Sequence, residues 1–159
     1  MAQRDGTWLV GKGNAPVGDA WLWLDAPASP TVTRLVATDA DRARFAATGT
    51  GQNTGPNTCQ QGSQLAPIDR HHPDLPDHAE VALHGKDWLS PNLTGLRVTD
   101  PSGASFTFGN FRTRVHDDRA IAARGLEHRR NLLPDIIDGW ARPCVTVTAQ
   151  QGRCRVSCA

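Results

Sequence analysis

The chain has 159 residues, of which 38% are hydrophobic and 21% charged, and its formal net charge is +1 at pH 7. This length suits one hydrophobic core in a soluble protein, so we expect a single domain over residues 1–159. A net charge so close to zero excludes a protein that selects its partner by strong overall charge. No apolar run approaches the roughly 18 residues that a membrane-spanning helix needs.

The N-terminal residues are too polar for a secretory signal peptide, because such a signal needs an apolar stretch of about 7–15 residues. Only Trp8, Leu9 and Val10 form an apolar run there. The default expectation is therefore a cytoplasmic protein, with export by a leaderless route as the alternative.

The first 38 residues favour short β-strands. Residues 7–10 predict one strand, and residues 19–25 are apolar on both faces, which is typical of a buried central strand. Residues 31–38 are rich in β-branched side chains and predict a third strand. The loop between the first two lacks the G-x-G-x-x-G spacing of nucleotide-binding loops, so we expect no nucleotide cofactor.

Three stretches predict helices. Residues 39–48 form the first, with a capping residue at the start and a glycine after the end. Residues 77–88 fit a helix or a strand, and the helix is favoured because Asp77 and Glu80 have the spacing of a capping box. Residues 118–133 form the last and longest helical stretch.

β-Hairpins are predicted at residues 95–114 and at the C-terminus. Asp100-Pro101-Ser102-Gly103 has the composition of a tight turn. In the last hairpin Cys144 lies opposite Cys158, close to the separation that a disulfide spans. The expected fold is α+β, in which short antiparallel hairpins at both ends of the chain carry two main helical segments.

Residues 49–76 predict a long irregular loop, and loops of this length in a compact domain are usually functional or disordered. Cys59 lies in the middle of this loop, with Cys154 as its candidate disulfide partner. Cys59 precedes the histidines, an order that resembles papain-like hydrolases, and His84-Gly85 resembles the His-Gly of caspase-like folds. These resemblances imply a thiol nucleophile, and a structural cysteine is the alternative.

Residues 71–84 hold the densest cluster of groups that bind metals or transfer protons. Imidazole and carboxylate together suit zinc or another divalent metal, and Glu80 and His84 have the i, i+4 spacing that places two ligands on one helix face. A solvated, proline-rich surface loop is the alternative. The candidate catalytic residues are His78, Glu80 and His84. The candidate metal ligands are His71, His72, His78 and His84.

His78-Ala79-Glu80 resembles the H-A-E of the zinc-dependent nucleobase deaminases. In that family the histidine binds zinc, and the glutamate shuttles protons while a metal-bound water attacks the base. The family also carries a P-C-x-x-C motif, whereas Pro143-Cys144 comes 65 residues after His78 and leads into a predicted strand. The resemblance implies a zinc ligand at His78 and a proton carrier at Glu80.

Arginines are concentrated between residues 112 and 130, where they could contact phosphate or nucleic acid. Acidic residues interspersed among them favour a salt-bridged helix face over a nucleic-acid surface. The arginines concerned are Arg112, Arg114, Arg119, Arg124, Arg129 and Arg130.

Two classes of function stay open. One is a small hydrolase-like enzyme, such as a toxin or effector domain, with a metal-assisted His/Glu site in residues 71–84. The other is a non-catalytic binding or assembly protein, such as a subunit of a virion or a secreted complex. The enzyme is favoured because of the histidine density, and the zinc-dependent deaminase is a lesser alternative. An enzyme should bring His78, Glu80 and His84 into one pocket, whereas a binding protein should leave them scattered.

Overall fold

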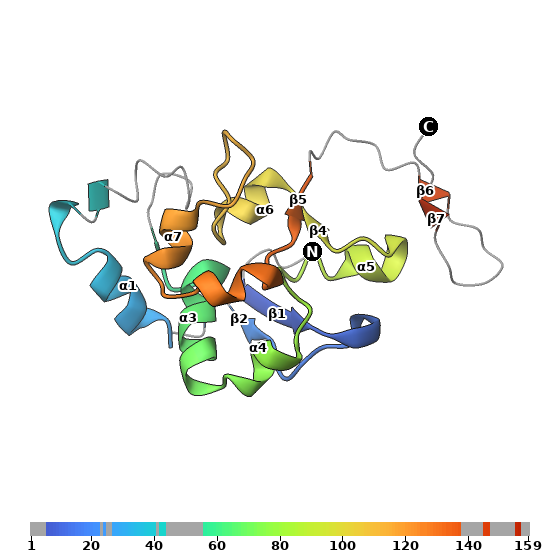
Figure 1. Cartoon of the computed structure of the whole chain (residues 1–159), viewed down its shortest axis with the longest axis horizontal. Helices are drawn as coiled ribbons and strands as arrows, with labels where there is room; N and C mark the ends of the chain where they lie inside the picture. The colour runs from blue at the N-terminus through green and yellow to red at the C-terminus, as the bar shows by residue number, and fades with distance from the viewer. Residues whose placement is uncertain are drawn as a thin grey trace.

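Short helices and small sheets follow one another along the chain in the computed structural model, so the α+β class is confirmed. Figure 1 shows the helices arranged around the central strands β1 and β2. None of the helices in the described ranges is long and apolar enough to cross a membrane. The structure describes residues 6–22, 24, 27–40, 42–43, 56–137, 145–146 and 155–156.

The main sheet has three strands in the order β2-β1-β3, and both pairs are antiparallel. β1 (Gly6–Val10) is the central strand, between β2 (Trp21–Leu22) and β3 (Val81–Leu83). The register places Leu9 opposite Ala82. All three residues of β3 are buried, as apolar residues near the middle of a core should be.

α3 (Gln61–His71) packs against β1 and contributes to the main hydrophobic core. Its side chains Leu65 and Ile68 are almost completely buried and belong to the same cluster as Leu9 and Phe108. Burial of such side chains stabilises the fold by roughly 1.5–3 kcal/mol each. The core therefore joins the first strand to a helix that begins more than fifty residues later.

Replacing Gly62 by alanine is expected to lower the free energy of unfolding by about 1–3 kcal/mol. A Cβ on residue 62 would lie 2.3 Å from the carbonyl oxygen of Thr107 and 3.0 Å from the ring of Phe108. The carbonyl belongs to the backbone and cannot rotate away, so α3 would have to shift. Alanine is otherwise the better helix former. Urea unfolding measures the effect, and a variant at least as stable as the parent would contradict this close packing.

A second, two-stranded sheet is parallel and pairs β4 (Val98–Thr99) with β5 (Asp135–Ile136). α6 (Pro101–Ser105) follows β4 directly. The carboxylate of Asp100 accepts hydrogen bonds from the backbone N–H groups of Ser102 and Gly103, and Pro101 fills the first helical position. The predicted hairpin at residues 95–114 is wrong, because Asp-Pro here begins a helix instead of a turn.

The other elements are short. The α-helices are α1 (Ser29–Leu35), α4 (Asp74–His78), α5 (Leu89–Thr94) and α7 (Asp118–Ala122). The 3-10 helices are η1 (Lys12–Asn14) and η2 (Glu127–Leu132). The last two strands are β6 (Val145–Thr146) and β7 (Arg155–Val156).

β6 and β7 are antiparallel, with Val145 opposite Val156. The predicted register, with Cys144 opposite Cys158, would instead place Val145 opposite Ser157, so the observed pairing is shifted by one residue. The three C-terminal cysteines themselves lie outside the described residues.

Several predicted elements in the first half of the chain are wrong. Residues 31–38 do not form a strand, because α1 occupies most of them and carries Pro30 in its first turn, where proline is favoured. Of the described residues in 19–25, only Trp21 and Leu22 form a strand, the short edge strand β2, in which Leu22 is 39% exposed. The predicted helix at 39–48 is helical at the described residues 39, 40, 42 and 43.

The central part of the chain also differs from expectation. α3 lies inside the predicted irregular loop 49–76, where burial of its apolar face outweighs the turn-forming composition. Residues 77–88 contain β3 instead of a helix, because pairing with β1 buries Val81 to Leu83. The predicted helix at 118–133 is divided into α7 and η2 by Gly125, whose φ of +71° is left-handed.

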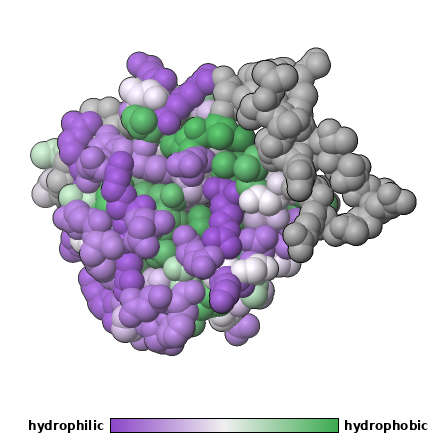
Figure 2. Space-filling model, turned by 45° about the vertical axis from the view of Figure 1, so that its right-hand side comes forward, coloured by the Kyte–Doolittle hydropathy of each residue, from purple (hydrophilic) through white to green (hydrophobic). Residues whose placement is uncertain are grey.

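The face of the molecule shown in Figure 2 is largely hydrophilic, with hydrophobic residues in patches between polar ones. Large hydrophobic side chains with substantial exposure include Leu24, Leu93 and Val115. Scattered apolar side chains of this kind are normal on globular proteins. This surface by itself therefore points to no particular partner.

Candidate functional site

The histidines in residues 71–84 have separate environments. His71 and His72, at the end of α3, are exposed. His78 is exposed at the end of α4, where its Nδ1 lies 2.7 Å from the carbonyl oxygen of Asp74. His84 follows β3 and is 2% exposed. In the parts of the chain that the structure describes, no group of three His, Cys, Asp or Glu side chains could hold a metal ion.

Glu80 lies just before β3 and forms an ion pair with Arg97 at 2.6 Å. Arg97 also donates hydrogen bonds to Asn14 Oδ1 and to the carbonyl oxygen of Gly11. These contacts connect the η1 loop to the segment before β4. Glu80 therefore has a structural partner in Arg97.

His84 belongs to a buried chain of hydrogen bonds that crosses the interior. Its Nε2 lies 3.0 Å from the carbonyl oxygen of Gly103 and 3.1 Å from Thr107 Oγ1. Thr107 donates its own hydrogen to Gln61 Oε1, and a carbonyl oxygen can only accept. His84 Nε2 must therefore carry the hydrogen. The chain connects β3, α6 and the beginning of α3.

The face of α3 at its N-terminal end is polar, although it is buried. Gln60, Gln61, Ser63 and Gln64 are each at most 3% exposed. Gln64 accepts a hydrogen bond from Thr7 Oγ1 and donates one to the carbonyl oxygen of Leu22, which joins α3 to both β1 and β2. Polar groups so deeply buried normally have a specific partner.

The segment that enters α3 is a compact polar turn. Asn57 Oδ1 accepts hydrogen bonds from the backbone N–H groups of Cys59 and Gln60. The thiol of Cys59 donates to the same oxygen at 2.8 Å. Residues 57–59 are half-buried and form the accessible rim next to the buried face of α3.

A charged cluster lies just after β3. Lys86 contacts the carboxylates of both Asp87 and Asp100. Thr99 Oγ1 donates a hydrogen bond to Asp87 Oδ2 at 2.8 Å. Burial raises the pKa of Asp100, but hydrogen bonds from Lys86 and from the backbone N–H groups of Gly103 and Ser102 outweigh this and hold the pKa below its ordinary value.

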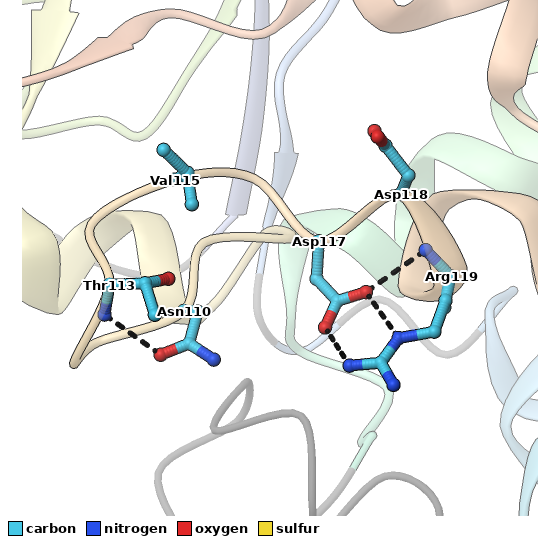
Figure 3. Close-up of a pocket in the computed structure, with 6 residues that line it drawn as sticks. All are labelled: Asn110, Thr113, Val115, Asp117, Asp118 and Arg119. Carbon is cyan, nitrogen blue, oxygen red and sulfur yellow. Dashed lines mark hydrogen bonds and ion pairs between the residues drawn. The ribbon is translucent and has the colours of Figure 1, made fainter.

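A surface hollow of about 330 Å³ lies in the loop before α7. Figure 3 shows the carboxylate of Asp117 directed at the guanidinium of Arg119, and Asn110 Oδ1 directed at the backbone of Thr113. Asp117 also caps α7 through the backbone N–H of Arg119. The polar groups of the hollow thus bind one another, which leaves little capacity for a ligand.

Most arginines of the segment 112–130 have acidic or aromatic neighbours. Arg129 contacts Asp69 and Asp77, and Arg130 contacts Asp118. Arg124 lies 5.3 Å from the centre of the Phe108 ring. Burial, together with the nearby positive charge of Arg34, lowers the pKa of Arg124 to about 10. Arg112 and Arg114 are exposed in the loop before α7.

Residues 1–150 match the model of the N-terminal domain of the FGGY family of carbohydrate kinases. The chain belongs to the FGGY family of carbohydrate kinases. It is 68% identical over 137 residues to the erythritol kinase of Brucella abortus (strain 2308), a match that covers 86% of this chain and 26% of that protein. The chain thus spans about a quarter of the length of this FGGY kinase.

Solved structures of a glycerol kinase and a xylulose kinase share the fold. Plasmodium falciparum glycerol kinase with ADP superposes with a TM-score of 0.71 at 24% identity, over 84% of this chain and 27% of that chain. Ligand-bound xylulose kinase from Lactobacillus acidophilus gives a TM-score of 0.67 at 18% identity, over 86% and 26% of the two chains. At these identities the similarity concerns the fold alone.

Membership of the FGGY family overturns the functions expected from the sequence. The hydrolase, toxin or effector, binding-protein and deaminase interpretations are wrong, and a metal site at the histidines is not supported. The histidine density was misleading because three of these side chains lie on the surface. The residues that sequence reasoning missed are the buried glutamines of α3. The one feature of the sequence that could have drawn attention to them is the occurrence of three glutamines within five positions, at Gln60, Gln61 and Gln64.

Proposed function

We propose that this chain is the N-terminal part of a kinase that transfers a phosphoryl group to a hydroxyl of a small polyol, with erythritol as the preferred substrate. The observation that carries this proposal is the 68% identity over 137 residues to erythritol kinase. The solved kinases, at 18–24% identity, carry the names of other substrates, among them glycerol, xylulose and gluconate. The much higher identity favours the four-carbon polyol.

The buried polar groups of the fold fit an uncharged, hydroxyl-rich substrate. The first turn of α3 offers amide and hydroxyl side chains, and residues 60–64 include no charged residue. Amide groups can both donate to and accept from hydroxyl groups. When a bound polyol lacks one hydroxyl, a polar group of such a site is left without a hydrogen-bond partner. This penalty allows the site to discriminate between polyols.

A kinase takes its phosphoryl group from ATP, with Mg²⁺ bridging the phosphates. The proposal therefore replaces the expectation that no nucleotide is used, and it keeps a divalent metal only as the partner of the nucleotide. Among the described residues no group of three His, Cys, Asp or Glu side chains could hold a metal ion, so this part of the chain offers no site built from protein ligands alone. We assign no step of phosphoryl transfer to them. A cytoplasmic location, where ATP is available, is part of the same proposal.

The test is a chimeric kinase, in which the 137 matching residues of this chain replace their counterparts in the Brucella abortus erythritol kinase. ATP-dependent phosphorylation is measured with erythritol, glycerol and a five-carbon polyol. We expect the chimeric kinase to act on erythritol with a kcat/KM within about tenfold of that of the parent enzyme. This corresponds to a loss of transition-state stabilisation of at most about 1.4 kcal/mol.

The parent erythritol kinase is the positive control for folding and assay. Circular dichroism and size-exclusion chromatography establish that the chimeric kinase is folded before activity is compared. A folded chimeric kinase that phosphorylates none of the three polyols would refute the proposed function. Preference for glycerol or the five-carbon polyol would refute the choice of erythritol.

A further inference from the structure

His116 lies where the loop before α7 contacts the start of β5. Gly109 and His116 face each other as an isolated antiparallel bridge, which closes this loop at its base. The Nε2 atom of His116 lies 2.9 Å from the carbonyl oxygen of Pro134, the residue before β5. A carbonyl oxygen can only accept a hydrogen bond, so Nε2 must carry the hydrogen. His116 thus joins two segments that are 18 residues apart in the chain.

The loop that His116 closes is ordered by its own hydrogen bonds. The backbone N–H of Asn110 donates to the carbonyl oxygen of Val115, and the N–H of Arg114 donates to the carbonyl oxygen of Asn110. Residues 111–115 are all exposed, so burial contributes little to holding the loop against the rest of the fold. The position of the loop therefore depends on the contacts at its base.

The other ring nitrogen of His116, Nδ1, is buried and has no hydrogen-bond partner among the described residues. In the neutral ring with its hydrogen on Nε2, Nδ1 is only an acceptor. In the protonated ring Nδ1 would carry a hydrogen that meets no acceptor, and the ring would carry a charge shielded from water. The neutral ring therefore fits this position, whereas the protonated ring does not.

The surroundings of His116 oppose its protonation as a whole. Burial lowers the pKa of His116 below its ordinary value and outweighs the hydrogen bond to Pro134, which raises it. Among the described charged groups nearby, Arg130 of η2 also lowers this pKa, while Asp135 of β5 and Asp118 of α7 raise it. The carboxylate of Asp118 already contacts Arg130, which weakens its attraction for a charged ring.

We propose that His116 is a pH-sensitive latch between the loop at residues 109–117 and the start of β5. The latch is closed while the ring is neutral, because Nε2 then donates to Pro134 and Nδ1 needs no acceptor. Protonation opens it, since the charged ring is better solvated outside this position. The open state binds the proton and the closed state does not, so the closed state loses stability as the pH falls through the ordinary histidine pKa, near 6.5. This device is independent of the proposed kinase activity.

The test is hydrogen exchange of the backbone amides of this chain, followed by NMR near pH 5 and near pH 7.5. The reporters are the N–H of Asn110, which bonds to Val115, and that of Ile137, which bonds to Thr99 of β4. After correction for the intrinsic pH dependence of exchange, their protection should be about 3- to 30-fold lower in acid, and the upper limit is set by the ordinary histidine pKa. The N–H of Val17, which bonds to β1, should change by less than about twofold. An equal loss at Val17 would show global destabilisation and would contradict a local latch.

His116→Gln removes the titration and keeps the donor, because the amide nitrogen of glutamine stands at the same place along the side chain as the ring Nε2. In this variant the protection of Asn110 and Ile137 should be the same at both pH values. His71→Gln is the matched control, since His71 is exposed, and it should keep the pH dependence of the parent. A glutamine variant that retains the pH dependence would refute the latch.

The unmutated chain provides a second measurement, which decides the matter even if His116→Gln does not fold. NMR follows the ring signals of His116 as the pH is lowered. The ring should titrate below the ordinary histidine value, near 6.5, and the loop signals should change over the same pH range. A ring that titrates at or above this value in the folded chain would overturn the proposal, as would loop signals that stay constant while the ring titrates.

Discussion

Replacing Phe108 by alanine is expected to lower the free energy of unfolding by about 3–5 kcal/mol. Phe108 is 1% exposed and belongs to the main core, together with Leu65 and Ile68 of α3. Its ring also lies beneath the guanidinium of Arg124 at 5.3 Å, so removal of the ring deprives that cation of a favourable contact. The backbone around residue 108 is held by α3 and α7, and the cavity is therefore unable to collapse fully.

Phe111→Ala provides a matched control three residues away. Phe111 is 54% exposed and has little buried area to lose. We expect its replacement to change the free energy of unfolding by less than about 0.5 kcal/mol. Urea unfolding, monitored by tryptophan fluorescence, measures both variants. Equal losses at the two positions would show that Phe108 does not occupy the core position assigned to it.

Local sequence patterns predicted the class of the fold and its first strand. The run Thr7 to Val10 is apolar and β-branched, and β1 is indeed the central strand of the main sheet. The strand at 31–38 was predicted from β-propensity, and the hairpin at 95–114 from the turn composition of residues 100–103. Both patterns are weak evidence, because Pro30 lies in the first turn of a helix and Asp100 caps one where they indicated β-structure.

Long-range pairing accounts for most of the remaining differences. β3 pairs with a strand more than seventy residues earlier, and β4 pairs in parallel with β5 across α6 and α7. A capping pattern such as that of Asp77 and Glu80 contributes about 1 kcal/mol, which is less than the burial of Val81 to Leu83 against β1. Such contacts are not encoded in any short window of the sequence.

The candidate site was harder to predict than the fold, because burial decides which polar residues are informative. His71, His72 and His78 are exposed, so their density reflects a polar surface. Gln61 and Ser63 are polar residues in a glycine- and glutamine-rich stretch, and only the folded structure reveals that they are buried. A sequence pattern reports the type of a side chain, whereas the site depends on its surroundings.

Replacing Lys86 by methionine is expected to lower the free energy of unfolding at pH 7 by about 2–4 kcal/mol. Lys86 is the one cation that contacts both Asp87 and Asp100 among the described residues, and the side chain of Asp87 is only 9% exposed. Methionine fills most of the same volume but leaves two carboxylates without their counterion. The expected loss is below that of a fully buried pair, because Lys86 and Asp100 are 22% and 36% exposed.

The loss of stability caused by Lys86→Met should depend on pH in a defined direction. The folded state holds the pKa of Asp100 below its ordinary value, so this carboxylate stabilises the fold above the unfolded pKa, near 3.9. That contribution disappears as the pH falls through the lower, folded value. Without Lys86 the pKa of Asp100 should rise. The difference in stability between parent and variant is therefore largest near neutral pH and shrinks below about pH 4.

Lys12→Met is the matched control, because Lys12 is the other of the two lysines in the chain and is exposed at η1. It should change the free energy of unfolding by less than about 0.5 kcal/mol at any pH between 3 and 8. Urea unfolding across this range measures both variants. A Lys86→Met variant whose stability parallels that of the parent at every pH would show that Asp87 and Asp100 are stabilised by their hydrogen bonds alone. The cluster would then position β4 and α6 through Thr99 and the cap of Asp100, with no need for the lysine charge.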